Sequence, residues 1–218
     1  MSVSVRTFNS STVQKVVVAL TGLFLCSFLV VHLSGNMLLF LNDGGRAYDV
    51  FSRFMSTNPL TRALEILLFA GFLLHMLYGL FTWLGNRRAR PEGYAMNRAA
   101  ENSTFASRWM FFNGSIVFFF LVVHLYSFWV PARFGAAEPS MYHLVRQAFA
   151  SPVYDAFYLL ALVCLGFHLR QGFQSAFQTF GLRPRWLRPL EVVAVVFWLF
   201  LPVAFAAMPV YFLWIQRL

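Results

Sequence analysis

Five long apolar segments dominate this chain, and each is long enough to cross a lipid bilayer as a helix. A bilayer core of about 30 Å needs roughly 20 apolar residues in a helix to span it. Of the 218 residues, 59% are hydrophobic and 11% are charged, a composition too apolar for a soluble domain of this size. We therefore predict an all-α integral membrane protein in which residues 1–218 form one domain. The predicted spans are Val16–Leu41, Leu60–Leu84, Met110–Val130, Val153–Gly181 and Leu190–Ile215.

The net charge of +9 is explained by membrane topology, so we do not predict nucleic-acid binding. Arg and Lys accumulate in the cytoplasmic segments of membrane proteins. Ten of the 17 basic residues precede span one or lie in the connections after spans two and four: Arg6, Lys15, Arg87, Arg88, Arg90, Arg98, Arg108, Arg183, Arg185 and Arg188. The opposite side has Arg46, Arg53, Arg62, Arg133, Arg146 and Arg217. This distribution predicts a cytoplasmic N-terminus and a C-terminus on the outer side.

The two connections on the outer side have their own helical pattern. In "RAYDVFSRFM" and "MYHLVRQAF" the apolar residues recur at helical spacing, which predicts short amphipathic helices at the membrane interface. Pro202 and Pro209 are expected to kink the fifth span. The two cysteines, Cys26 and Cys164, lie in apolar runs, so we predict neither a disulfide nor a cysteine cluster.

Each of the first four spans contains one histidine, and these histidines follow an internal repeat. "LVVHL" occurs at Leu29–Leu33 and again at Leu121–Leu125. His32 and His124 are 92 residues apart, and His75 and His168 are 93 residues apart. The spacing suggests two helical hairpins related by a pseudo-twofold axis, with a fifth helix added.

The depth of the histidines in the membrane separates them into two layers. At ~1.5 Å per residue, His32 and His124 lie roughly 22–25 Å from the inner ends of their spans, and His75 and His168 roughly 14–20 Å. Each layer pairs one helix from each hairpin. Two facing imidazoles in a bundle core are typical of bis-axial haem ligation, whereas zinc needs three or four ligands at one level. Gly71, Gly79 and Gly172 leave room for a porphyrin, so we predict two b-type haems; interhelical hydrogen bonding remains the alternative.

Several motifs resemble the five-helix dihaem cytochrome b subunit of succinate:quinone and quinol:fumarate oxidoreductases. They are "KVVVALTGLFLCSFLVVHLSGN", "ARPEGY", "SRWMFFNGSIVFFFLVVHL" and "HLRQGFQSAFQTFGL". The resemblance implies a multi-pass subunit of the bacterial inner (cytoplasmic) membrane. Such a subunit anchors a flavoprotein and an iron–sulfur subunit on the cytoplasmic face and exchanges electrons with a quinone, commonly menaquinone. It also implies that His32 and His124 bind the distal haem, and His75 and His168 the proximal haem. Some members have an acid two residues before the last of these histidines, where this chain has Gly166.

Haem propionates and a quinone need polar partners near the ends of the spans. For the propionates of the proximal haem we expect Lys15, Arg108, Trp109 and Arg170, and for those of the distal haem Arg133, Arg146 and His143. We place quinone chemistry beside the outer haem. Glu65 is the favoured acid there, followed by Asp49. Alternatively, Glu65 is an interfacial carboxylate paired with Arg62 or Arg46.

Two other functions remain open at this point. The chain could be the cytochrome b subunit of another quinone-linked enzyme, a formate dehydrogenase or a hydrogenase. It could also be a haem-free structural anchor whose histidines hold helices together. The sequence itself does not separate succinate oxidation from fumarate reduction.

Overall fold

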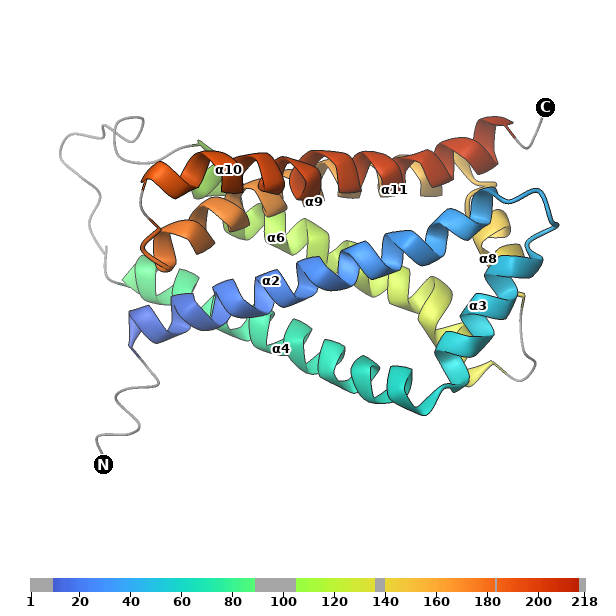
Figure 1. Cartoon of the computed structure of the whole chain (residues 1–218), viewed down its shortest axis with the longest axis horizontal. Helices are drawn as coiled ribbons and strands as arrows, with labels where there is room; N and C mark the ends of the chain where they lie inside the picture. The colour runs from blue at the N-terminus through green and yellow to red at the C-terminus, as the bar shows by residue number, and fades with distance from the viewer. Residues whose placement is uncertain (1–9, 89–104, 136–139, 183, 216–218) are drawn as a thin grey trace.

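The computed structural model describes residues 10–88, 105–135, 140–182 and 184–215. Within these ranges all regular structure is helical (Figure 1). Five helical stretches are long and apolar enough to cross a membrane: Ser11–Phe40, Pro59–Arg88, Trp109–Phe134, Pro152–Thr179 and Arg188–Trp214. The five predicted spans and the all-α membrane fold are confirmed.

The helices follow one another in the order of the two predicted hairpins and the added span. The first hairpin consists of α2 (Ser11–Asn36) with a 3-10 turn (Met37–Phe40), α3 (Arg46–Thr57) and α4 (Pro59–Arg88). The second consists of α6 (Phe105–His124), a π-helical segment (Leu125–Trp129), α7 (Val130–Phe134), α8 (Met141–Ala148) and α9 (Pro152–Thr179). The fifth span runs through α10 (Pro184–Val195), a π-helical segment (Val196–Phe200), α11 (Leu201–Val210) and a last π-helical segment (Tyr211–Ile215).

Local capping residues explain where the spans begin. The Ser10 side chain accepts a hydrogen bond from the backbone N–H of Val13, so α2 starts earlier than the predicted Val16. Asn58 accepts from the N–H of Leu60 in the same way, immediately before Pro59 in the first turn of α4. These capping residues lie outside the apolar runs. Hydropathy alone therefore places the start of each span later in the sequence than the start of its helix.

The first four long helices form a ring in which each contacts two neighbours. Along the ring α2 packs on α4, α4 on α6, α6 on α9, and α9 on α2. The fifth span packs along α9 and also contacts α2 (Figure 1). It therefore covers one side of the bundle only. As a result α9 is the most buried long helix, and the two hairpins have unequal surroundings.

Both predicted amphipathic segments are helices, and they lie at the same end of the bundle. α3 and α8 contact each other at the end opposite the start of α2 (Figure 1). We call the end with α3 and α8 the distal end, and the end where α2 begins and α4 finishes the proximal end. The apolar residues of the second segment, Val145 and Phe149, join Phe128, Tyr158 and Phe212 in a buried cluster.

Two features fix α3 against α8. The Asp49 carboxylate accepts a hydrogen bond of 2.9 Å from the backbone N–H of Tyr142, in the first turn of α8. Gly45 has a left-handed backbone with φ of 87°, and a side chain there would collide with the Tyr142 ring. Asp49, expected as a second candidate for the quinone site, thus holds the two distal helices together.

The prolines of the fifth span are accompanied by π-helical turns. A proline has no backbone N–H and clashes with the preceding turn, so the helical ladder must change around it. The segment Val196–Phe200 precedes Pro202, and Tyr211–Ile215 follows Pro209. The segment Leu125–Trp129 likewise precedes Pro131 on the third span. Pro202 and Pro209 therefore lie next to widened turns of the fifth span.

Gly166 marks the closest approach between α9 and the fifth span. A Cβ atom at this position would lie 2.8 Å from the backbone oxygen of Trp198, and Gly166 is buried. The partner atom belongs to the backbone, so it cannot move aside by a change of rotamer. Gly166 therefore permits the packing of the fifth span, and this site has no room for an acidic side chain.

We expect Gly166→Ala to destabilise the protein by about 1–3 kcal/mol, as overpacking of a well-packed interface does. Thermal unfolding of the detergent-solubilised protein, followed by circular dichroism, measures the change. Gly85→Ala is the matched control, because nothing lies within 4 Å of its Cβ position in α4. Equal stability of the Gly166→Ala and Gly85→Ala variants would contradict the packing assignment.

Candidate functional site

The four histidines of the spans form two pairs across the bundle core. The ring centroids of His32 on α2 and His124 on α6 are 5.7 Å apart. Those of His75 on α4 and His168 on α9 are 6.2 Å apart. The two helices of each pair stand opposite each other in the ring, so both pairs cross the centre. The structure thus brings together the same partners that the sequence predicts.

The pairs lie at two levels along the bundle. The His75 ring contacts Val18 and Thr21 of α2 and lies beside Gly22. Gly22 precedes His32 by ten residues, or ~15 Å of helix. On the opposite hairpin the His168 ring lies beside Gly114, ten residues before His124. The His75–His168 pair is therefore the proximal pair, and the His32–His124 pair is the distal pair.

The spacing within each pair suits two ligands on opposite sides of one iron. With metal–nitrogen distances of ~2.0 Å, two such imidazoles have centroids about 6 Å apart. Within the described ranges, no three His, Cys, Asp or Glu side chains gather as a metal site. Each pair thus offers two histidine ligands. This number fits a metal ion that takes its other ligands from a bound cofactor.

Glycines border the proximal pair in both hairpins. A Cβ at Gly22 would lie 3.2 Å from the His75 ring, and a Cβ at Gly114 would lie 3.3 Å from the His168 ring. Gly79 and Gly172, one helical turn after His75 and His168, have nothing within 4 Å of their Cβ positions. Both glycine pairs keep the repeat spacing of the histidines. A flat macrocycle beside the pair would need open positions such as Gly79 and Gly172, whereas Gly71, also predicted to leave room, is packed against the Phe24 ring, 2.9 Å from its Cβ position.

Aromatic side chains surround the distal pair instead. Phe28 stacks on the His32 ring with centroids 5.3 Å apart, and Phe205 of α11 approaches the same ring to 5.6 Å. Phe120 and Phe128 lie near the His124 ring at 5.7 and 5.3 Å. The phenylalanines flanking these histidines in sequence thus line the pair.

Hydrogen bonds differ among the four rings. The Nδ1 of His75 lies 3.2 Å from both the Thr21 hydroxyl and the Val18 carbonyl oxygen. The Nδ1 of His124 lies 3.2 Å from the Tyr158 hydroxyl, which shares a 2.8 Å hydrogen bond with Tyr154. The Nδ1 of His168 is buried and has no hydrogen-bond partner within the described part of the chain. His75 and His124, one histidine of each pair, are therefore oriented by a neighbouring helix.

The remaining ring, His32, is covered by an amide. The Asn36 Nδ2 lies 3.5 and 3.4 Å from the two His32 nitrogens, so it sits over the ring and not in line with either nitrogen. The amide oxygen of Asn36 accepts a 3.5 Å hydrogen bond from the Tyr48 hydroxyl of α3. Burial, followed by the nearby Asp49 carboxylate, raises the pKa of Tyr48 to about 12, so its hydroxyl remains a donor at neutral pH.

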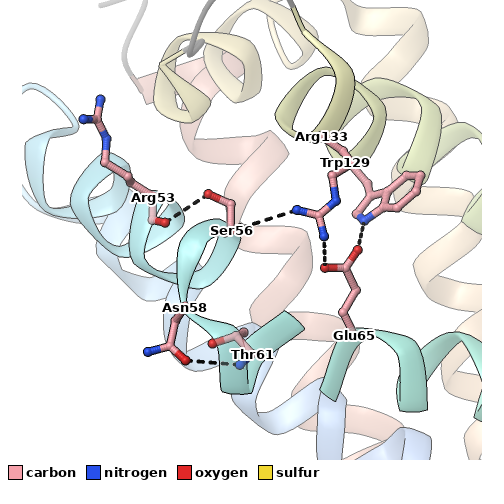
Figure 2. A network of polar contacts seen from close by, with 7 residues as sticks. All are labelled: Arg53, Ser56, Asn58, Thr61, Glu65, Trp129 and Arg133. Atoms are coloured by element: carbon pink, nitrogen blue, oxygen red, sulfur yellow. Dashed lines mark hydrogen bonds and ion pairs between the residues drawn. The ribbon is translucent and has the colours of Figure 1, made fainter. Parts of the chain in front are cut away.

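Glu65 forms a second polar cluster near the distal end (Figure 2). Its carboxylate accepts a 2.8 Å hydrogen bond from the Trp129 indole and a 2.7 Å ion-paired hydrogen bond from Arg133. Arg133 also donates to the Ser56 backbone oxygen at 3.4 Å. The side chains of Arg133 and Glu65 are 18% and 22% exposed, so the pair is largely enclosed. The carboxylate therefore has a cationic partner, but Arg133 takes the place of the expected Arg62 or Arg46.

The other predicted contact residues have varied surroundings. Arg133, expected at the distal haem, is engaged by Glu65, and Arg170 lies over the Trp198 ring at 5.4 Å. Trp109 packs against Phe112. The side chains of Lys15, His143 and Arg146 are exposed, and the backbone N–H of His143 is hydrogen-bonded to the Ser140 cap. The side chain of Arg108 lies outside the described residues.

The sequence reasoning missed Thr21, Tyr158 and the glycines beside the proximal histidines. Gly22 and Gly114 are 92 residues apart, as His32 and His124 are. The repeat could therefore have identified this pair of glycines from the sequence. Thr21 and Tyr158 stand in apolar runs without a motif of their own. Thr21 contacts His75, and Tyr158 contacts His124, because of the way the helices are rotated about their axes.

Comparison with known proteins supports one family. The chain is similar to the succinate dehydrogenase cytochrome b558 subunit of Bacillus subtilis, with 26% identity over 160 residues. The match covers 71% of this chain and 72% of that protein. No protein-family model and no solved structure matches the chain. The resemblance to the cytochrome b membrane subunits of succinate dehydrogenases and fumarate reductases, predicted from the motifs, is confirmed.

Proposed function

We propose that this relative of a succinate dehydrogenase cytochrome b subunit carries electrons across the membrane on two b-type haems. The electrons pass between a membrane quinone, for which menaquinone is the expected form, and the flavin and iron–sulfur subunits of a succinate dehydrogenase or fumarate reductase. The observation that carries the proposal is the pair of histidine–histidine contacts at two levels of the bundle. When bound, each haem supplies a one-electron carrier in the low-dielectric core.

In this proposal the four histidines would bind the haem irons. His32 and His124 would hold the distal haem, and His75 and His168 would hold the proximal haem. An imidazole nitrogen without a partner is costly in a hydrocarbon layer, and an iron between the two rings would give each ring a partner. The spacing of both pairs and the open positions at Gly79 and Gly172 support this assignment. A haem-free anchor would account for the interhelical hydrogen bonds of His75 and His124, but it gives no reason for the open positions at Gly79 and Gly172.

The propionates belong at the ends of the bundle, near cations. Lys15, Arg108, Trp109 and Arg170 remain our candidates at the proximal end. At the distal end we retain Arg146, His143 and Arg133, the last of which would be shared with Glu65. Lys15 and Arg146 are exposed, and among the described residues neither forms an ion pair. Their long side chains can therefore turn toward a carboxylate with little rearrangement.

The dicarboxylate chemistry belongs to partner subunits. An iron–sulfur cluster requires four ligands, commonly cysteines, and this chain has two cysteines in separate spans. The flavoprotein and iron–sulfur subunits are expected on the cytoplasmic face, at the proximal end beside Arg87 and Arg88. These two arginines end α4 and are exposed, so they suit an acidic docking partner. The chain would thus anchor the complex in the bacterial inner membrane.

We place the quinone site at the Glu65 cluster. Trp129 lies five residues beyond His124, so the Glu65 carboxylate is about 7 Å further along the bundle than the distal ring. A quinol that gives up two protons needs an acceptor close to the haem and close to water. Glu65 is a partly exposed carboxylate beside the distal pair, oriented by Trp129 and Arg133. Asp49 remains a second candidate, although it already binds the backbone at the start of α8.

The ligand assignment predicts that His32→Ala removes one haem and leaves the other. The distal iron would lose an axial ligand, whereas the His75–His168 pair lies about 15 Å away along the bundle. The haem content and the reduced-minus-oxidised absorption spectrum of the purified complex measure the result. His75→Ala is expected to remove the other haem. If both haems stay spectrally intact in either variant, the pairing is wrong.

The quinone assignment predicts that Glu65→Gln keeps both haems and slows quinol turnover by at least about 100-fold, the scale of general acid–base catalysis. The amide still accepts a hydrogen bond from Trp129 but takes up no proton. Haem content and quinol-dependent turnover are scored separately. Glu191→Gln is the matched control, since Glu191 is an exposed glutamate on α10. Normal turnover in the Glu65→Gln protein would remove Glu65 from the mechanism.

One purification separates this function from the two alternatives. A haem-free anchor would show no haem absorption. A cytochrome b subunit of a formate dehydrogenase or hydrogenase would show haem but would not co-purify with the flavin subunit of a succinate dehydrogenase or fumarate reductase. Absorption from two haems together with co-purified covalent or bound flavin supports the proposed complex.

A further inference from the structure

The proximal pair is asymmetric in its hydrogen bonding. His75 is held at Nδ1 by two oxygen atoms of α2, whereas His168 has no partner at Nδ1 within the described residues. In the repeat, Gly22 and Gly114 occupy the same place beside the two rings. Thr21 corresponds to Asn113 at the 92-residue spacing, so the two hairpins differ at the residue just before the shared glycine.

The hydrogen bonds around Thr21 determine which His75 nitrogen carries the proton. The Thr21 hydroxyl donates to the Val17 carbonyl oxygen at 2.7 Å, so its lone pairs are free to accept. The Val18 carbonyl oxygen can only accept. Both oxygens lie 3.2 Å from His75 Nδ1, so this nitrogen must be the donor. The neutral ring then has its proton on Nδ1 and an unprotonated Nε2, the form that binds a metal.

We propose that Thr21 is a positioning residue for His75: with the Val18 carbonyl, its hydroxyl holds the Nδ1–H tautomer and the ring plane that the proximal iron requires. This inference rests on the proposed function. Partners of this kind fix the orientation of a ligating imidazole and raise its basicity. A more basic imidazole stabilises the oxidised iron, so Thr21 lowers the reduction potential of the proximal haem. His168 lacks such a partner in the described structure. Thr21 therefore affects the reduction potential through His75 alone.

The test compares Thr21→Val, Thr21→Ser and wild type in the purified complex with its partner subunits. Valine keeps the shape of threonine but cannot accept from Nδ1–H, and serine keeps the hydroxyl. The measurements are redox titration of both haems by absorption and the electron paramagnetic resonance spectrum of the oxidised haems. The His75→Ala spectrum identifies which band belongs to the proximal haem.

In the Thr21→Val protein we expect the reduced-to-oxidised ratio of the proximal haem, at a fixed applied potential, to rise about fivefold, as for the loss of one hydrogen bond. Its resonance signal is expected to shift, because the Val18 carbonyl alone then holds the His75 ring. The distal haem should not change, and serine should restore both readouts. Thr179→Val is the matched control: Thr179 makes the same bond to a preceding carbonyl, 2.8 Å to Ser175, at the far end of α9.

Other outcomes overturn the proposal. An unchanged proximal potential and resonance signal in the Thr21→Val protein would show that the hydroxyl has no role. Equal shifts of both haems, or loss of the proximal haem in the valine and serine variants alike, would show a packing role. Loss of the proximal haem with valine and its retention with serine would support the proposal. Absence of haem from the wild type would instead overturn the proposed function, and this inference with it.

Discussion

A polar ring inside a hydrocarbon layer must find a partner, and this requirement organises the molecule. Water is absent there, so an unpartnered imidazole costs up to several kcal/mol. The chain places four imidazoles on four helices and directs them into the core as two pairs. A bundle whose opposite helices face each other at the same level allows this, and the ring of α2, α4, α6 and α9 provides that arrangement.

The fifth span then makes two similar hairpins unequal. It packs on α9 and α2, where Gly166 meets the Trp198 backbone and Phe205 reaches the His32 ring. In the described part of the chain no such cover lies over α4, whose outer face remains largely exposed as lipid contact requires. The fifth span thus adds Phe205 to the aromatic neighbours of the distal pair, whereas Phe28, Phe120 and Phe128 belong to the first and third spans. Repeat symmetry sets the positions of the histidines, and the added helix changes the surroundings of one of them.

The spans and the pairing could be predicted from the sequence because both depend on position along a helix. Hydropathy marks the apolar lengths, and the rise per residue gives the level of each histidine. The alternative considered for Glu65 pairs it with Arg62 or Arg46, whereas its partner in the structure is Arg133, from another span. Asp49 was expected near a quinone, but its carboxylate meets the Tyr142 N–H. Contacts between helices depend on rotation and tilt, which hydropathy does not specify.

The two ends of the bundle carry different polar groups and therefore differ in chemistry. The distal end has a glutamate that is ion-paired and partly exposed, held between Trp129 and Arg133. The proximal end has the exposed arginines of α4 and the α2 turn that orients His75. In the proposed function, protons are handled at the distal end and electrons leave toward a soluble partner at the proximal end. The separation follows from chemistry: a carboxylate that exchanges protons must reach water, whereas a ligand that sets a potential must be shielded from it.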